Sequence, residues 1–209
     1  MKQTVFFSFF LILVLFQSCN REPQLYFTYL HSNPDRDEIS NDSVMKLQEA
    51  HIKNITRLAN EGIILAAGPF NNGGGIFIIS ASSMHELNEI LITDPAIKAG
   101  RFRLENHPLQ ISQGELHKVD TGYTMTFYDF IQTDGTEKKF DFSSEISTAS
   151  DSLELVARLK FTDSSENILL IKNSSSTVSS DEIIKDLIHP AEIKLSKILW
   201  IAKESFEGK

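Results

Sequence analysis

The sequence predicts an α+β protein in which a ferredoxin-like β-α-β-β-α-β unit is followed by a smaller α+β region. Three patterns predict the first unit: a strand-like alternation at residues 25–30, a helical spacing of apolar residues at 44–58, and two short apolar runs within 63–80 joined by a turn rich in Gly and Asn. The 209 residues are 41% hydrophobic and 23% charged, so there is enough apolar material for a sizeable core. The chain is therefore expected to be globular, with one large or two small domains.

The first strand and the first helix follow from two different periodicities. Aromatic and β-branched residues alternate in residues 25–30, which is typical of a strand buried on at least one side. A loop containing Pro34 follows, and apolar residues then recur at intervals of three and four, as on one face of a helix that Gly62 ends. That apolar stripe consists of Val44, Leu47, His51, Ile55 and Leu58. His51 is therefore expected on the buried face of the helix.

A hairpin, a second helix and a last strand complete the first unit. Residues 63–68 and 76–80 read as buried strands on either side of the Gly- and Asn-rich turn. A serine pair caps the next helix, and a very short helix follows that begins at Asp94-Pro95 and ends at a glycine. The alternation in residues 101–107 then predicts the final strand, so this unit spans residues 24–109.

Residues 110–209 are predicted to form a smaller α+β region, either a separate module or a late extension of the first sheet. Three runs are strand-like: 123–131, 153–161 and 167–171. A capping box at residues 179–182 predicts a helix, and after Pro190 an apolar stripe indicates that this helix restarts and continues towards the end of the chain. The stripe consists of Ala191, Leu195, Ile198, Leu199, Ala202 and Phe206. No internal repeat and no family pattern is evident here.

The N-terminus carries a targeting signal. Residues 1–18 contain one lysine and then an apolar run that is too short for an ordinary membrane span but suits a secretory signal peptide. The run ends at Phe16 and leads through Gln17 and Ser18 into Cys19, the only cysteine, and this resembles the lipobox of bacterial lipoproteins. The resemblance implies cleavage before Cys19, lipidation of that residue, a tether at 19–23 and a location in the bacterial cell envelope. A plain secretory peptide with an incidental cysteine, or a short uncleaved anchor, is the alternative.

Composition and missing motifs exclude several kinds of function. The formal net charge is −8 and the basic residues are scattered, which argues against nucleic acid as a partner. With Cys19 lipidated no thiol remains, so disulfides and cysteine catalysis are excluded. There is no Gly-x-Ser-x-Gly nucleophile motif, and glycines 73–75 lack the Lys-Ser/Thr ending of a phosphate-binding loop. The six histidines include no i, i+4 pair and there is no cysteine pair, so no metal site is predicted.

Several short motifs, taken in their order and spacing, resemble the YCII-related, or YciI-like, family over about residues 24–109. They are Gln48-Glu49-Ala50-His51 with Asn54, Gly62, Ala67-Gly68-Pro69-Phe70, the run Asp94-Pro95-Ala96-Ile97-Lys98-Ala99-Gly100-Arg101, and Glu105-Asn106-His107-Pro108. The resemblance implies a ferredoxin-like unit that pairs into a dimeric α/β barrel, and hence a homodimer. It also implies a candidate active site made of a first-helix histidine and the aspartate of the Asp-Pro pair, here His51 and Asp94.

A histidine and a carboxylate in contact are suited to acid–base chemistry. A carboxylate that accepts a hydrogen bond from one ring nitrogen fixes the tautomer and leaves the other nitrogen free to take a proton. The sequence equally allows His51 to be a satisfied core histidine and Asp94 to be only a helix N-cap, worth about 1 kcal/mol. Whether these two side chains meet decides between the two interpretations.

Our hypothesis from the sequence is a membrane-tethered, cofactor-independent hydrolase or lyase that acts on a small molecule. The alternative is a non-catalytic dimerisation or ligand-binding module of the envelope. Lys98 and Arg101 are candidates for binding an anionic substrate group, or they are solvated or paired with Glu105. His107, near the end of the last strand, is a further weak candidate.

Overall fold

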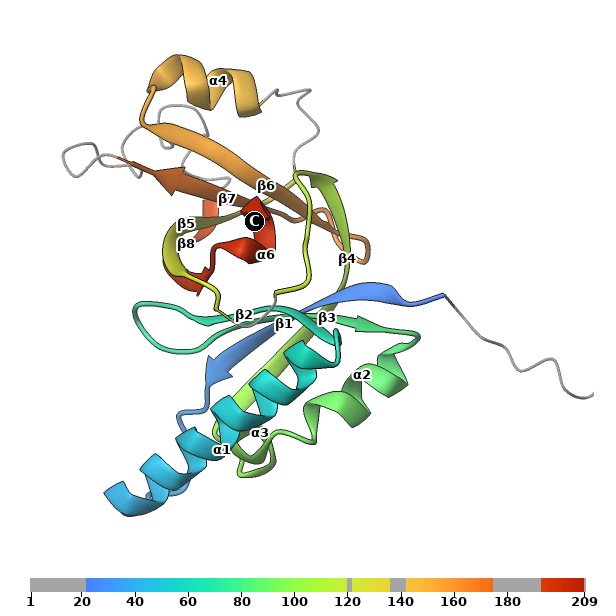
Figure 1. The fold of residues 1–209 in the computed structure, drawn as a ribbon, viewed down its shortest axis with the longest axis vertical. Helices are drawn as coiled ribbons and strands as arrows, with labels where there is room; N and C mark the ends of the chain where they lie inside the picture. Colours follow the sequence, from blue (N-terminus) through green and yellow to red (C-terminus); the bar gives the residue numbers. More distant parts are fainter. Residues whose placement is uncertain (1–21, 120–121, 136–141, 175–192, 209) are drawn as a thin grey trace, which may run out of the picture.

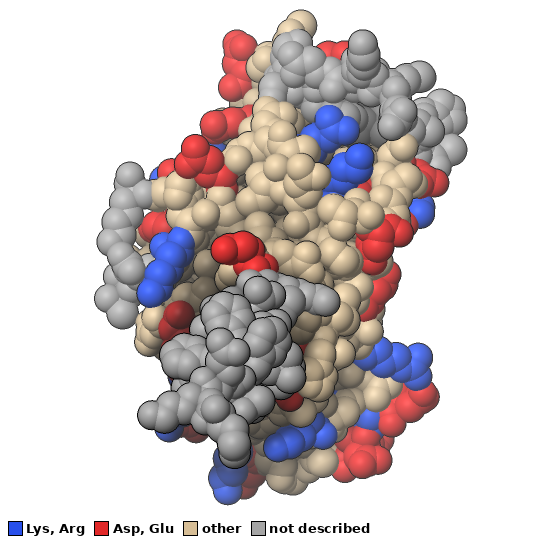
Figure 2. Space-filling view, turned by 90° about the vertical axis from the view of Figure 1, so that its right-hand side faces the viewer, with Lys and Arg blue, Asp and Glu red and all other residues tan. Residues whose placement is uncertain are grey.

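The computed structural model describes residues 22–119, 122–135, 142–174 and 193–208. The predicted signal sequence with Cys19 and the helix expected after the capping box at 179–182 lie outside the described residues. Within the described part, no helix combines the length and the apolar character needed to cross a bilayer. On the face that Figure 2 shows, acidic and basic side chains are interspersed, and the basic ones form no continuous patch.

The first unit has the ferredoxin-like topology that the sequence predicts. Its elements are β1 (Gln24–Ser32), α1 (Asn41–Asn60), β2 (Ile64–Pro69), β3 (Gly75–Ala81), α2 (Met84–Leu91), α3 (Pro95–Lys98) and β4 (Phe102–Gln113). The strands lie in the antiparallel order β2-β3-β1-β4, and the helices lie on one side of them (Figure 1). The α+β class and the β-α-β-β-α-β unit are therefore confirmed.

The C-terminal region repeats this strand order. Its elements are β5 (Met125–Thr133), α4 (Phe142–Ala149), β6 (Leu153–Phe161), β7 (Asn167–Asn173), β8 (Ile193–Ala202) and α6 (Glu204–Glu207). The strand order in this region is β6-β7-β5-β8. Counted from the first strand of each unit, both units have the order second, third, first, fourth. The chain thus contains two units of one topology, a repeat that its residues do not reveal.

The two units close one eight-stranded sheet into a barrel. On one side β4 pairs with β6, in a register that places Leu109 opposite Phe161. On the other side the edge strands β2 and β8 meet at a bridge between Phe70 and Leu199. Gly68 permits this approach, because a Cβ at that position would lie 2.0 Å from the carbonyl oxygen of Trp200. The outer strands of each unit therefore pair with the other unit of the same chain. The family resemblance had implied that a second subunit would take this place.

Three apolar clusters follow from this architecture. The barrel interior is filled by residues of both units, including Phe27, Phe130 and Phe161, which are all fully buried. A second cluster packs α1 and α2 onto the outer face of the first unit, with Leu58 and Leu87 among its members. A third packs α4 against β6 and β7 of the second unit. Each unit therefore has its own outer core, and the interior core joins them.

The prediction of a helix through residues 191–206 is wrong, because residues Ile193–Ala202 form β8 and only Glu204–Glu207 are helical. Leu195 and Leu199 are four residues apart, so they fit a helical stripe as well as one face of a strand. In the structure every second side chain faces the barrel, with Leu199 and Ile201 completely buried. Pairing with β5 along the whole strand outweighs the local helical pattern.

Candidate functional site

His51 is held on the part of α1 that packs against the sheet. The helix begins at the N-cap Ser40, whose side chain accepts a hydrogen bond from the backbone N–H of Ser43. The His51 residue is 8% exposed, and its ring lies 6.1 Å from that of Phe77 and 5.8 Å from that of Phe102, centroid to centroid. These two aromatic rings restrict the orientation of the imidazole.

Asp94 is the N-cap of α3 and the partner of His51 at the same time. Its Oδ1 accepts hydrogen bonds from the backbone N–H groups of Ala96 at 2.9 Å and Ile97 at 3.2 Å. Its Oδ2 lies 2.8 Å from Nδ1 of His51 and accepts a longer bond, 3.4 Å, from Nδ2 of Asn54. The two roles that the sequence offered as alternatives therefore belong to different oxygens of one carboxylate.

Electrostatics favour an ionised Asp94. Burial by itself would raise the pKa of this carboxyl, since the residue is only 1% exposed. The hydrogen bond and charge of His51 and the N–H groups of Ile97 and Ala96 outweigh burial, so the pKa of Asp94 lies below its usual value. An ionised carboxylate only accepts hydrogen bonds, which makes Nδ1 of His51 the donor.

The other ring nitrogen is therefore the chemically available one. A neutral imidazole that carries its proton on Nδ1 has a lone pair on Nε2. No hydrogen bond from a described residue reaches Nε2 of His51. The pair has the arrangement required of a general base and its orienting acid.

His51 lines a cavity of about 620 Å³, which is within the usual size of a small-molecule site. One face of α1 forms a side of this cavity, through Gln48, His51, Ile52, Ile55, Thr56, Ala59 and Asn60. Strands β2 and β3 with the turn between them, single residues of β1 and β4, the segment after β4 and residues of the second unit form the rest. Asp94 is not among the lining residues, so it contacts the cavity only through His51.

The three weaker candidates do not lie at this cavity. Lys98 is exposed, and Arg101 donates a hydrogen bond from Nη1 to the backbone oxygen of Asp37 at 2.7 Å. His107 lies on β4 in a separate polar network, and none of the three lines the cavity. Glu105, the suggested partner of the basic residues, instead contacts His31 and His107.

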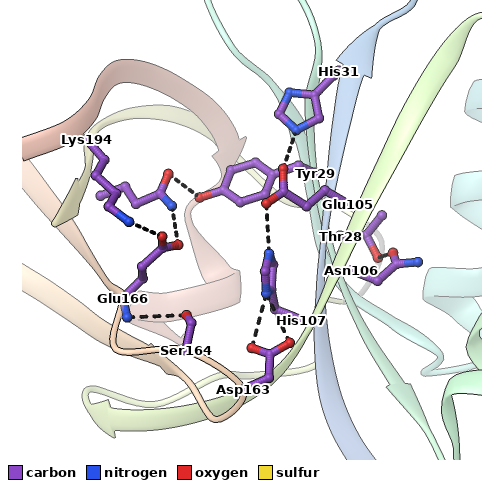
Figure 3. A network of polar contacts seen from close by, with 11 residues as sticks. Thr28, Tyr29, His31, Glu105, Asn106, His107, Asp163, Ser164, Glu166 and Lys194 are labelled. Carbon is purple, nitrogen blue, oxygen red and sulfur yellow. Dashed lines mark hydrogen bonds and ion pairs between the residues drawn. The ribbon is translucent and has the colours of Figure 1, made fainter. Parts of the chain in front are cut away.

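That separate network ties the two units together (Figure 3). Nδ1 of His107 lies 3.1 Å from Asp163, which follows β6, and Nε2 lies 3.0 Å from Glu105. The His107 ring also stacks on Phe161 of β6 at a centroid distance of 4.2 Å. Burial would raise the pKa of Glu105, but hydrogen bonds from His107 and His31 hold it below the usual value. The cluster is thus a charged link between β4 and the second unit.

A second branch of the network crosses the barrel. The hydroxyl of Tyr29 on β1 donates to Oε1 of Gln132 on β5 at 2.9 Å, and Nε2 of Gln132 donates to Glu166 at 2.7 Å. Glu166 also forms an ion pair with Lys194 (Figure 3). Desolvation, together with the nearby carboxylates, raises the pKa of Tyr29, so its hydroxyl stays protonated. This branch also connects one unit with the other.

Sequence reasoning missed several residues of the site. Asn54 had a detectable signal, because three residues after His51 on a helix it lies on a neighbouring position of the same face. Met125 and Trp200, which line the cavity from the second unit, had none, since their contact depends on barrel closure.

Among the described residues no group of three His, Cys, Asp or Glu side chains is arranged to hold a metal ion.

Comparisons with solved structures find distant likenesses. A 5-chloro-2-hydroxyhydroquinone dehydrochlorinase from Burkholderia phenoliruptrix, in complex with 2,5-dihydroxybenzoquinone, is 19% identical, with 45% of this chain and 96% of that chain covered and a TM-score of 0.32. A proposed monooxygenase from Fusobacterium nucleatum is 10% identical, with 88% and 93% covered and a TM-score of 0.45. An anthrone oxidase-like protein is 8% identical, with 88% and 92% covered and a TM-score of 0.45.

The sequence itself matches one family. The sequence model of the YCII-related domain matches residues 25–105, which include both members of the His51–Asp94 pair. Comparison with curated proteins gives no match. The match to residues 25–105 confirms the resemblance to the YCII-related family that the motifs around His51 and Asp94 predicted.

Proposed function

We propose that this protein is a small-molecule enzyme in which His51 is the general base and acid and Asp94 is its positioning residue. The observation that carries the proposal is the 2.8 Å contact between Nδ1 of His51 and Asp94 at the wall of a cavity, with Nε2 left without a partner among the described residues. An oriented imidazole in a largely apolar site is suited to removing a proton from a bound molecule.

The reaction that fits is an elimination or a hydrolysis. In an elimination, Nε2 takes a proton from a carbon of the substrate, the electron pair of that bond forms the new double bond, and the leaving group departs with its own pair. The imidazolium is stabilised by the Asp94 carboxylate and can return its proton to the leaving group. In a hydrolysis, Nε2 takes a proton from water as the water oxygen bonds to the substrate. The bond from the substrate to its leaving group then breaks, and the leaving group departs with that electron pair and receives the proton from the imidazolium. Both routes move only protons and electron pairs of the substrate, water and imidazole.

A ligand-binding module without catalysis is the second candidate, and the apolar lining of the cavity favours it. The two functions are separated by 5-nitrobenzisoxazole, an uncharged ring that opens when a base removes its C–H proton. We expect wild-type protein to accelerate this ring opening and His51→Gln to lower the rate about 10²-fold or more. His31→Gln, which changes an exposed histidine outside the cavity, is the matched control. A folded His51→Gln variant with the wild-type rate would contradict the enzyme and leave the binding module.

We also propose that the mature protein is anchored in the bacterial cell envelope by lipid on Cys19. The support is the apolar run up to Phe16, which is followed closely by Ser18-Cys19. Cell fractionation tests it: we expect the wild type in the membrane fraction and Cys19→Ser in the soluble or precursor fraction. Equal membrane association of the two, with an unmodified Cys19 by mass spectrometry, would contradict the lipid anchor.

A further inference from the structure

We infer that the second unit supplies one wall of the cavity, and that the cavity takes an uncharged, elongated and mainly apolar molecule whose reactive group lies at His51. The placement of the reactive group rests on the proposed function, whereas the wall and the ligand class do not. No such role for the second unit follows from the YCII-related domain, because the wall lies outside residues 25–105.

The wall is built by barrel closure. Met125 on β5 and Ala202 on β8 are register partners, and both line the cavity together with Trp200. Leu199 and Ile201 belong to the interior core, so the alternation along β8 places Trp200 and Ala202 on the outer face, the face on which α1 covers the first unit. The close contact of Gly68 with the Trp200 backbone puts this surface directly beside β2. The site is therefore incomplete without the second unit.

The cavity is elongated along α1. Its lining residues on this helix run from Gln48 to Asn60, and twelve steps of about 1.5 Å correspond to a length of about 18 Å. The segment that follows β4 reaches the far end, because Nζ of Lys118 donates to the backbone oxygen of Asn60 at 3.0 Å and the next residue, Val119, lines the cavity. His51 and Asn60 are nine residues apart, so a ligand that reaches from His51 to this segment extends about 13 Å.

The described part of the lining carries no fixed charge. None of the described residues that line the cavity is Asp, Glu, Lys or Arg, and the polar ones are Gln48, His51, Thr56, Asn60, Tyr123 and Ser205. Away from Lys118, whose Nζ contacts Asn60 at the far end, a ligand charge would lose its hydration and find no opposite charge among the described lining residues, which is costly. Lys98 and Arg101 cannot compensate, since neither lines the cavity. An uncharged ligand is therefore favoured over an anionic one.

A pair of fluorescent probes tests the ligand class. N-phenyl-1-naphthylamine is uncharged, and 8-anilinonaphthalene-1-sulfonate has the same rings with one added sulfonate. Trp200 is the only tryptophan of the chain, so quenching of protein emission by the probe reports on this wall. We expect the uncharged probe to quench Trp200 with one site per chain, and the sulfonate to bind at least about tenfold more weakly. Equal affinities, or binding of the uncharged probe without quenching, would overturn the inference.

Two variants test the wall, with the emission of the bound probe as the readout. Trp200→Ala removes a lining side chain and is expected to weaken binding of the uncharged probe about tenfold. Ile198→Ala is the matched control, because Ile198 is exposed on the same face of β8 but does not line the cavity. If Trp200→Ala binds the uncharged probe with wild-type affinity, Trp200 does not contribute to the cavity wall. The same conclusion holds if Ile198→Ala weakens binding while Trp200→Ala does not.

The His51→Gln variant keeps this test separate from the proposed function. It should bind the uncharged probe within about twofold of the wild type, since the apolar surface is unchanged. Loss of the wall contacts would leave the base intact, and loss of the base would leave the wall intact. Failure of one inference is therefore distinguishable from failure of the other.

Discussion

Replacing Asp94 by asparagine separates the two roles of this carboxylate. Asparagine is as good an N-cap as aspartate, so its oxygen can keep the bonds from Ala96 and Ile97 at the start of α3. Its amide NH₂ then faces Nδ1 of His51, where the carboxylate oxygen accepts a bond at 2.8 Å. Two donors cannot share a hydrogen bond, so the imidazole must change tautomer or turn away.

The expected magnitudes follow from these contacts. The lost bond is charge-assisted and buried, which corresponds to about 1.5–3 kcal/mol of the free energy of unfolding. The wrong tautomer places a proton on Nε2 and should lower the rate of 5-nitrobenzisoxazole opening by about 10²–10⁴-fold. Asp94→Ala also loses the cap and should be less stable than Asp94→Asn by about 1 kcal/mol. The assays are the opening rate at saturating substrate and denaturant unfolding of each variant.

The pH dependence of stability provides an internal check on Asp94→Asn. Because the folded-state pKa of Asp94 is lowered, its ionised form stabilises the fold above the unfolded-state pKa of about 3.9, and this contribution is lost as pH falls through the folded-state pKa. Asp94→Asn should therefore differ from the wild type most at neutral pH and least at acidic pH. A variant with the wild-type rate and a pH-independent difference in stability would refute the assignment of Asp94 as the positioning residue.

Three further predictions concern the link between the two units. His107→Ala removes the contacts with Glu105 and Asp163 and should lower the free energy of unfolding by about 1–3 kcal/mol without changing the ring-opening rate; a slower reaction would place His107 in catalysis. Gly68→Val should cost about 1–3 kcal/mol or more, because its Cβ meets the Trp200 backbone; a melting temperature equal to the wild type would show that β2 and β8 do not touch. Sedimentation of the chain without its predicted signal peptide should give a monomer, since both sheet edges are paired within the chain; a dimer would restore the expectation from the family resemblance.

The first half of the fold was predictable because its signals are local. The stripe around His51 and the Asp94-Pro95 cap each specify a short element, and the hairpin turn joins two plainly apolar runs. The candidate pair followed from the family resemblance, while its geometry required the tertiary structure. What sequence reasoning treated as competing explanations for Asp94 proved to be compatible, because each oxygen has a different set of partners.

The second half was less predictable because its structure depends on contacts distant in sequence. Leu195 and Leu199 fit two periodicities, and only pairing with β5 and closure against β2 select the strand. The repeated topology leaves no residue pattern, because a strand order can be kept by any sequence with suitable alternation. The contribution of Trp200 to the cavity could not be inferred before the two units were known to share one barrel.

The tautomer of His51 tests the central claim most directly. Nitrogen-15 spectra of the imidazole in the wild type, recorded across neutral pH and assigned with His51→Gln, distinguish protonated from unprotonated ring nitrogens. We predict a neutral form with the proton on Nδ1 and an unprotonated Nε2, and a change of this pattern in Asp94→Asn. A neutral form with the proton on Nε2, or identical spectra in the wild type and Asp94→Asn, would contradict the account.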